Sequence, residues 1–468
     1  MKQKEGSNLG KEEPWLNKKR VIVFILAVIL FFLPQILNIN GLDGNMSAAL
    51  GILLVAALFW ITEVIPLYAT SLVIVLLQIM SISEDAVTVN EALAPFFNHI
   101  IALFFGGFIL AAALQRYNVD IKLAKEMLKR FGKSPRGVLL GLMGVTAFLS
   151  MWMSNTATTA LMVALAIPIY TQIPKEEKFT KAMMLGIPFA ANIGGMATPI
   201  GTPPNAIIIN ELAIARPGYA SINITFLEWM VIAIPLTLIM LLFTYLLLYY
   251  SYKPSVKKLN INLEHSDLRG FSKKQLFVLF IFGITVLLWL TSSVSTVDNL
   301  FRSAGIIALI PAVIFFSTGL LDKDDLAKLN WNVLLLMGGG LSLGNAIDST
   351  GLADWIVSLI DHQALGVILV IVVFVAIAIV LSTFMSNTAT AAVMAPIMII
   401  VGMDLGATVS IMAAIAFSCS MAMALPVSTP PNAIAYGQDV IDMKDMIING
   451  VIVGIFGIIM LTLLFGIF

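Results

Sequence analysis

The hexapeptide MSNTAT occupies residues 153–158 and returns at residues 385–390, each time in the middle of a long apolar stretch. Its Ser, Asn and two Thr side chains are polar, and polar groups in apolar surroundings are costly unless they are paired or serve a function. The identical hexapeptide returns after 232 residues, which indicates an internal duplication. The duplicated polar centre is therefore the starting point for predicting the fold.

The composition indicates a membrane protein. The chain has 468 residues, of which 59% are hydrophobic and 12% are charged, whereas a soluble domain carries about a quarter charged residues. No long polar stretch separates the apolar segments, so we expect an all-α polytopic membrane protein without an attached soluble domain. The single cysteine, Cys419, excludes an intramolecular disulfide framework and is expected to be a small buried core residue.

Apolar segments of about the length that a spanning helix needs recur along the whole chain. We predict eleven spans, of which the fifth and the tenth are interrupted by polar breaks: 21–37, 47–64, 67–80, 99–115, 180–210, 226–250, 275–291, 303–319, 332–347, 407–437 and 445–467. The second and third are separated at Glu63 to Pro66. Two apolar stretches remain, 137–172 and 364–401, and each is centred on one MSNTAT copy. They are predicted to be re-entrant hairpins.

The distribution of basic residues tests this arrangement. With the N-terminus inside, 25 of the 27 Lys and Arg residues fall in inside segments, and only Arg216 and Arg302 fall outside. This asymmetry agrees with the positive-inside rule and predicts a cytoplasmic N-terminus. The polar, basic residues 1–20 precede a retained first span, because no small-residue cleavage site follows them. A pair of ordinary spans in each remaining stretch would preserve the same parity, so the re-entrant interpretation depends on the polar centres.

The duplication extends beyond MSNTAT. At the same shift, FFGGF at residues 104–108 aligns with LMGGG at residues 336–340, and each glycine-rich span is followed by an amphipathic segment, at 118–132 and at 351–362. Five crossings lie between the two hexapeptides, and an odd number reverses the membrane face. The repeats are therefore inverted in topology, a plan that recurs in secondary transporters with their sites near the midplane.

The interrupted spans carry a second paired motif, Thr-Pro-Pro-Asn, at residues 202–205 and 429–432. Ser, Asn and Thr are favoured N-caps, and proline is favoured at the first helical position. Both MSNTAT and both TPPN motifs are therefore predicted to begin helices inside the membrane. Helix N-termini attract anions, and irregular backbone at that depth offers carbonyl oxygens to a cation.

No basic side chain is predicted at mid-span, and His99, His265 and His362 fall at span ends or in loops. A dianion in such a site would need compensation from helix ends and from bound cations, because an uncompensated charge at the bilayer centre costs several kcal/mol. This favours cation coupling. Helix dipoles and water could also suffice, in which case one anion would exchange for another.

The chain contains no HExxH, no P-loop, no metal-spaced Cys and His, and no His beside a nucleophile. We therefore predict that the protein is not an enzyme and that no nucleic acid is among its partners. Gradients or a partner chain must then supply the driving energy.

Four segments carry a resemblance to a known family: FLSMWMSNTAT from Phe148, NIGGMATPIGTPPNAI from Asn192, STFMSNTAT from Ser382 and ALPVSTPPNAIAYG from Ala424. Together they resemble the paired motifs of the divalent anion/sodium symporter family, the di- and tricarboxylate transporters typified by the bacterial INDY proteins. The resemblance covers the whole chain, in order and in both repeats.

The resemblance implies a homodimer in the membrane lipid, with eleven spans and two re-entrant hairpins per protomer. A scaffold domain would dimerise while a transport domain moves as an elevator. The corresponding division of this chain is a cytoplasmic segment 1–20, scaffold parts 21–136 and 251–363 (the latter with a cytoplasmic linker), and transport parts 137–250 and 364–468.

The resemblance also implies site residues. Substrate carboxylates would bind Asn155, Thr156, Asn387, Thr388 and Pro430. One Na⁺ would bind Ser150, Ser154, Asn155 and Gly201, and a second would bind Ser382, Asn387 and the backbone near Val427. Ser382 stands where a threonine is expected in the symporters, a change that keeps the hydroxyl. The usual substrates are succinate, malate, fumarate and related C4 dianions, with citrate in some members.

The leading hypothesis is thus a plasma-membrane dicarboxylate transporter driven by sodium. The first alternative is a sodium-independent dicarboxylate exchanger on the same fold, since some relatives work in that way. A channel or sodium/proton antiporter is disfavoured because we find no acidic residue at mid-span. An intramembrane enzyme would lack both nucleophile and base.

Overall fold

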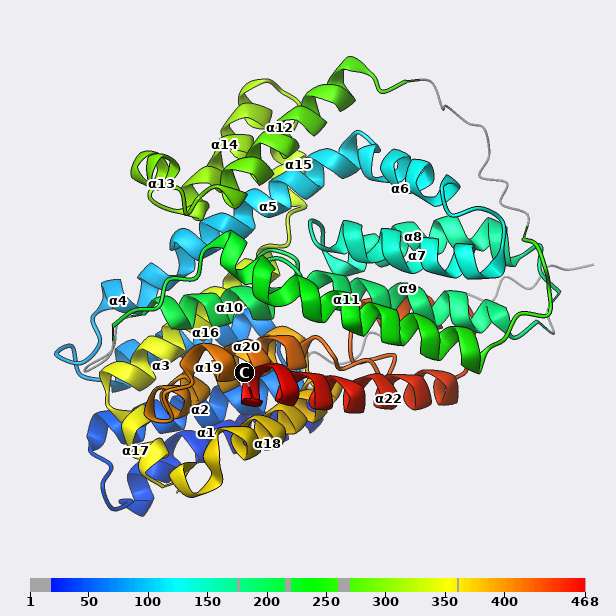
Figure 1. Cartoon of the computed structure of the whole chain (residues 1–468). Helices are drawn as coiled ribbons and strands as arrows, with labels where there is room; N and C mark the ends of the chain where they lie inside the picture. Colours follow the sequence, from blue (N-terminus) through cyan, green and yellow to red (C-terminus); the bar gives the residue numbers. More distant parts are fainter. Residues whose placement is uncertain (1–17, 175–176, 215–219, 260–269, 360–361, 468) are drawn as a thin grey trace, which may run out of the picture.

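The computed structural model describes all residues except 1–17, 175–176, 215–219, 260–269, 360–361 and 468. Every regular element in these residues is helical (Figure 1). The first repeat contains these helices: α1 (Lys18–Leu37), α2 (Gly44–Thr62), α3 (Leu67–Ser81), α4 (Val89–Leu93), η1 (Ala94–Phe97), α5 (His99–Arg116), α6 (Val119–Lys129), α7 (Pro135–Ser150), α8 (Asn155–Tyr170), α9 (Phe179–Gly195), α10 (Pro203–Ala213) and α11 (Phe226–Ser251).

The second repeat follows the same order. It contains these helices: α12 (Lys273–Leu290), α13 (Ser295–Phe301), α14 (Ala304–Ser317), α15 (Lys323–Ala327), α16 (Trp331–Ser349), α17 (Leu352–Ser358), α18 (His362–Phe384), α19 (Asn387–Asp404), α20 (Thr408–Cys419), α21 (Pro430–Tyr436), α22 (Met443–Thr462) and a final π-turn η2 (Leu463–Ile467). His265 lies outside the described residues.

The helices confirm the membrane class. Within the described residues, eight helical segments are long and apolar enough to cross a bilayer, and α13 with α14 forms a further candidate that is bent by 64°. The predicted separation of the second and third spans is confirmed, because α2 ends at Thr62 and Glu63 takes a left-handed conformation before α3 begins. The two amphipathic segments form α6 and α17, and Cys419 is completely buried, as expected.

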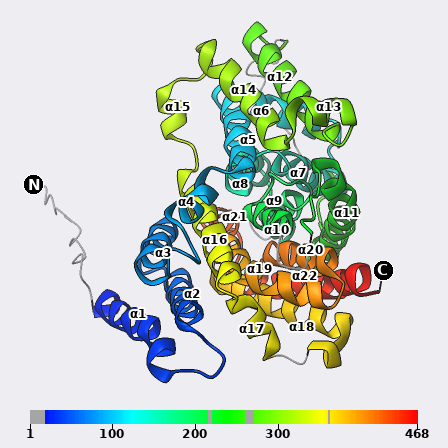
Figure 2. The ribbon, with the colours of Figure 1, turned by 90° about the vertical axis from the view of Figure 1, so that its left-hand side faces the viewer.

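The two repeats pack against each other through the glycine-rich helices. α5 of the first repeat lies along α14 of the second, and α16 of the second lies along α3 of the first. Gly106 sits directly against the carbonyl of Ala308, and Gly339 sits against the Ser71 side chain, where a methyl group would collide. Small residues of this kind let helix backbones approach closely within a membrane. In Figure 2, α1–α3 and α12–α14 lie at opposite ends of the molecule.

Each MSNTAT copy lies at the tip of a helical hairpin, as the sequence predicts. α7 and α8 form the first hairpin, and α18 and α19 form the second. The arms differ in length, because α7 and α8 have 16 residues each whereas α19 has 18, and the straight part of α18 after its kink at Gly366 has 19.

The two predicted interrupted spans are confirmed as helix pairs, α9 with α10 and α20 with α21. The second half of each pair packs across the repeat boundary. α10 contacts α19 and α20, while α21 contacts α8 and α9. This exchange brings both hairpin tips and both breaks into one region.

Candidate functional site

One cavity of about 550 Å³ is lined by both MSNTAT motifs and both TPPN motifs, and we refer to it as the motif cavity. The motif residues in its wall are Ser154, Asn155, Thr156, Ala157, Thr202, Pro203, Ser386, Asn387, Thr388, Thr429, Pro430 and Pro431, and the adjacent Gly201 and Ser428 line it as well. Residues 232 positions apart in the sequence thus face one space. This juxtaposition is the geometric consequence of the inverted repeat.

The hairpin tips begin helices at the motif cavity. Ser154 caps α8 by accepting a hydrogen bond from the Ala157 backbone N–H at 3.3 Å. Ser386 caps α19 in the same way through Ala389, at 3.1 Å. The side chain that caps each helix leaves other N–H groups of the first turn free for a ligand.

The breaks provide the other two helix beginnings. α10 begins at Pro203 after Thr202, and α21 begins at Pro430 after Thr429. Thr429 accepts from the Asn432 backbone N–H at 3.4 Å, whereas the Thr202 side chain makes no capping bond. All four predicted helix starts are therefore present, and each carries partial positive charge toward the region of the cavity.

In the first repeat, Ser150 and Gly201 lie next to the tip. The completely buried Ser150 hydroxyl donates to Asn155 Oδ1 at 2.6 Å. A Cβ on Gly195 would lie 2.5 Å from the same Asn155 Oδ1 and 3.1 Å from the carbonyl oxygen of Gly201. Only glycine at position 195 allows this approach, which gathers hydroxyl, amide and carbonyl oxygens within a small space.

The second repeat builds a similar cluster around the equivalent residues, Ser382 and Asn387. The Ser382 hydroxyl lies 3.0 Å from Asn387 Oδ1 and 2.9 Å from the carbonyl oxygen of Cys419. The Ser428 hydroxyl donates to the carbonyl of Thr383 at 2.9 Å. Val427 is 81% exposed and lies outside the wall of the motif cavity, so the neighbouring Ser428 is the residue of this loop that lines the cavity.

The asparagines that end the TPPN motifs brace the two breaks. Asn205 Nδ2 donates to the carbonyl oxygens of Gly195, Met196 and Thr198 at 2.8–3.2 Å. Asn432 Nδ2 donates to Met423 and Leu425 at 3.2 and 3.0 Å. A single buried amide thus holds several carbonyls of an irregular loop, which stabilises the loop where no helix can form.

Asn192 links the repeats and was not identified from the sequence. Its Oδ1 accepts from Asn155 at 3.4 Å, and its Nδ2 donates to Thr429 Oγ1 at 3.3 Å and to Asn432 Oδ1 at 3.4 Å. The position equivalent to Asn192 in the second repeat holds Cys419, as the shift between the TPPN motifs shows. Asn192 therefore could not be identified by comparing the two repeats, because the equivalent residue is not an asparagine.

The wall of the motif cavity contains one basic residue that the sequence analysis assigned to a loop. Lys328 lines the cavity together with Gln115, Asn330 and Asn332, whereas no Asp or Glu in the described part of the chain does so. Lys328 reaches the cavity from the turn before α16, outside any span. The prediction that no basic side chain lies at mid-span is therefore unaffected, but a lysine from a loop adds positive charge to the wall of the cavity.

A buried acidic residue lies near the end of α10, outside the predicted spans. Glu211, in α10 just past the predicted span, is 1% exposed, and its carboxylate lies against Gly344 of α16. α10 continues to Ala213, three residues beyond the predicted span, and this places the carboxylate in the packed interface.

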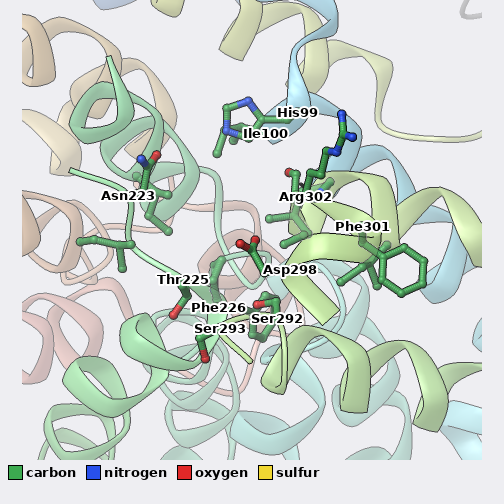
Figure 3. A pocket seen from close by; sticks show the side chains of 18 of the residues that line it. His99, Ile100, Asn223, Thr225, Phe226, Ser292, Ser293, Asp298, Phe301 and Arg302 are labelled. Atoms are coloured by element: carbon green, nitrogen blue, oxygen red, sulfur yellow. Dashed lines mark hydrogen bonds between the residues drawn. The ribbon is translucent and has the colours of Figure 1, made fainter. Parts of the chain in front are cut away.

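A second cavity of about 790 Å³ lies at the other end of α5 (Figure 3). His99, Ile100 and Leu103 line it, whereas Phe104, Phe108 and Gln115 line the motif cavity. In Figure 3 the Asp298 carboxylate points into the middle of the labelled residues, and His99 and Arg302 lie along one edge.

Both cavities are lined by residues of the break between α9 and α10. Pro199 lines the second cavity and Ile200 lines the motif cavity, so the break between α9 and α10 separates them. In α5, Leu103 lines the second cavity and the next residue, Phe104, lines the motif cavity. Two pairs of consecutive apolar residues, Leu103 with Phe104 and Pro199 with Ile200, therefore lie between the two cavities.

The chain belongs to the family described as the sodium:sulfate symporter transmembrane region, which matches residues 15–468. It is a membrane transport protein of that family, and the match confirms the divalent anion/sodium symporter family predicted from the motifs.

Two relatives show how far the similarity extends. An uncharacterized transporter of Haemophilus influenzae is 32% identical over 473 residues, covering 97% of this chain and 98% of the relative. The sodium-dependent dicarboxylate transporter SdcS of Staphylococcus saprophyticus is 33% identical over 488 residues, covering 97% and 92%. The similarity therefore includes both repeats.

Two solved structures share the fold at low sequence identity. MtrF of Neisseria gonorrhoeae, from a class of antimetabolite efflux pumps, has a TM-score of 0.57 at 14% identity, over 97% of this chain and 95% of its own. The YdaH transporter of Alcanivorax borkumensis has a TM-score of 0.52 at 12% identity, over 80% and 86%. Both are transporters, and at these identities the likeness concerns the fold alone.

Proposed function

We propose that this protein carries C4 dicarboxylates such as succinate, malate and fumarate across the plasma membrane, coupled to Na⁺. One observation above all supports the proposal: helix beginnings from both repeats meet a single cavity that no described carboxylate lines. Helix N-termini suit carboxylates, and two groups of them suit a molecule with a carboxylate at each end. A relative named for sodium-dependent dicarboxylate transport supports the same substrate class.

In this proposal each hairpin tip binds one of the two carboxylates of the substrate. Asn155 and Thr156 bind one carboxylate, and Asn387 and Thr388 bind the other. Pro430 shapes the wall at the start of α21. All five residues line the motif cavity, which supports these roles. Thr156 and Pro430 are exposed there, so a ligand can reach them without a change in packing.

The coupling ions bind behind the tips. One Na⁺ binds among Ser150, Ser154, Asn155 and Gly201, and a second binds near Ser382, Asn387 and the backbone at Val427. Hydroxyl, amide and carbonyl oxygens are the hard, neutral ligands that an alkali cation accepts in such unwound regions. Asn155 and Asn387 belong to both ion and substrate sites in this scheme, so the binding of Na⁺ would order the substrate site.

The movement that we propose is an elevator. Residues 137–250 and 364–468 form the transport part, residues 21–136 and 251–363 form a scaffold that dimerises, and residues 1–20 are cytoplasmic. The exchange of α10 and α21 between the repeats supports a single transport body, because each half-helix packs against the hairpin and broken helix of the other repeat. The motif cavity opens beside Lys328 and Gln115, at the lysine-rich end that the positive-inside rule assigns to the cytoplasm.

The experiment that tests the proposal measures uptake of radiolabelled succinate into proteoliposomes, with and without an inward Na⁺ gradient, into empty and into succinate-loaded vesicles. Sodium-dependent uptake into empty vesicles is the expected result. Uptake only into loaded vesicles, independent of Na⁺, would establish the alternative exchanger. Sulfate uptake serves as the comparison, because the family description names sulfate. If no dicarboxylate moved under any gradient, the proposed substrate class would be wrong.

A further inference from the structure

Lys328 lies at the mouth of the motif cavity. It follows α15 in the turn that leads into α16, and it is exposed. Gln115, Asn330 and Asn332 are exposed beside the same cavity. This wall therefore offers one positive charge and several amide N–H donors. It is formed by α5, by α16 and by the turn that precedes α16, and not by the hairpins.

Two of the three acidic residues shortly before Lys328 in the sequence are bound to Arg116. Arg116 at the end of α5 binds Asp322 at 3.0 Å and also binds Asp325. The Arg116 guanidinium lowers the pKa of Asp322 below its ordinary value of 3.8, so this carboxylate stays charged and paired at neutral pH. Asp324 lies four residues before Lys328, yet the ion pairs of the described residues include none with Lys328. The lysine charge is therefore available to an anion from solution.

The turn that carries Lys328 is fixed to its surroundings. Trp331 Nε1 donates to the carbonyl of Leu326 at 2.9 Å, across the turn. The Trp331 ring packs on Phe105 of α5 at 5.9 Å, and the Tyr117 hydroxyl donates to the carbonyl of Leu320 at 2.9 Å. The backbone of Lys328 is thus held against α5 independently of the hairpin tips.

We infer that Lys328, with Asn330 and Asn332, forms an anion-recruitment site on the scaffold, which captures a carboxylate of substrate that enters the motif cavity from the lysine-rich face. The inference rests on the proposed function, because it concerns the same cavity and the same dicarboxylates. The captured anion then passes to the helix beginnings at Asn155 and Asn387.

The position of the site determines which kinetic quantity it controls. An exposed positive charge raises the local concentration of an anion at the cavity mouth, and salt screens this effect. Lys328 lies outside the hairpin tips, so it does not travel with the bound substrate in the elevator scheme. It therefore lowers KM for substrate that enters from this face and leaves the maximal rate nearly unchanged.

The test uses Lys328→Cys, because the natural Cys419 is completely buried and gives little background. Succinate transport from the lysine-rich face is measured in proteoliposomes, after treatment with membrane-impermeant thiol reagents. We expect the variant to raise KM roughly three- to fivefold. A reagent that attaches an ammonium group should restore KM, and a reagent that attaches a sulfonate should raise it further. Both effects should diminish at high salt.

Lys323→Cys is the matched control, since Lys323 is an exposed lysine on α15 that does not line the cavity. Neither reagent should change its KM. If Lys328→Cys kept the wild-type KM, or if both reagents altered it equally, the recruitment site would be refuted while wild-type succinate transport still upheld the proposed function. A wild-type protein that moves no dicarboxylate would instead overturn the proposed function, and the inference with it.

Discussion

The two cavities at the ends of α5 differ in the charge of the residues that line them. The motif cavity is lined by helix beginnings, by neutral polar side chains and by Lys328. The second cavity is lined by Arg302 and His99, but also by Glu228 and Asp298. Among the residues that the structure describes, an anion in the motif cavity meets only neutral or positive groups, whereas in the second cavity it meets carboxylates. From this difference we expect an anion to be favoured in the motif cavity by the helix beginnings and Lys328, and to be disfavoured in the second cavity by the carboxylates.

The largest effect is expected from Asn155→Ala and Asn387→Ala. Each removes a polar group aimed at the ligand, and a hydrogen bond to a charged group contributes about 1.5–3 kcal/mol. Affinity should therefore fall roughly 10- to 100-fold, and uptake should be abolished at ordinary substrate concentrations. Uptake into proteoliposomes checks this, with size-exclusion profiles to show that the variants fold. Full uptake by either variant would contradict the assignment of the motif cavity as the substrate site.

The next effect is expected from Gly195→Ala. The new methyl group would lie 2.5 Å from Asn155 Oδ1, so it should displace the amide that the hairpin tip presents. Overpacking of this kind costs about 1–3 kcal/mol. We expect a roughly tenfold loss of apparent Na⁺ affinity in sodium-dependent uptake, since Gly195 borders the oxygen cluster of the first repeat.

Gly144→Ala is the control for this substitution. Gly144 lies in α7, and a Cβ there would meet nothing within 4 Å. It should transport like the wild type, with equal or higher thermal stability, because alanine favours a helix over glycine. Equal behaviour of the two variants would show that the contact between Gly195 and Asn155 has no functional role.

Much of the fold and of the motif cavity could be predicted from the sequence. The paired motifs identified both hairpin tips and both breaks, because proline and cap residues act locally and leave a readable pattern. Lys328 and Asn192 could not be found in this way. Lys328 reaches the cavity only through the packing of α16 beside α5, and Asn192 bonds to Thr429, 237 residues away. Such contacts depend on tertiary structure and have no local signature.

A smaller effect is expected from Arg116→Gln. Without Arg116, Asp325 becomes free to pair with Lys328 three residues further on, a spacing at which helical side chains meet. KM for substrate from the lysine-rich face should rise roughly twofold, as exposed ion pairs contribute little. In the double variant Arg116→Gln, Lys328→Gln, the first substitution should add nothing further. Additive effects would show that Arg116 does not act through Lys328.

The ion pair between Arg116 and Asp322 also predicts how the effect of Lys328 on KM varies with pH. Arg116 lowers the pKa of Asp322 below 3.8, so the pair is complete above that value and is lost only as the pH falls through the lowered pKa. The contribution of Lys328 to KM should therefore stay constant between about pH 6.5 and 8, measured as the ratio of KM in Lys328→Gln to KM in the wild type. A ratio that changes steeply in this range would indicate another titrating group at the mouth.

The smallest effect is expected from Asp298→Asn in the second cavity. Asp298 is exposed and lies beyond the apolar residues Leu103 and Phe104, so solvent and salt screen its charge from the motif cavity. Substrate affinity from the lysine-rich face should change by less than about twofold, because exposed charges interact weakly. A large loss would mean that the two cavities act on the same bound ions. The Asp298 charge would then act across the break at Pro199 and Ile200, and its carboxylate would have to be counted among the groups that interact with the bound cations.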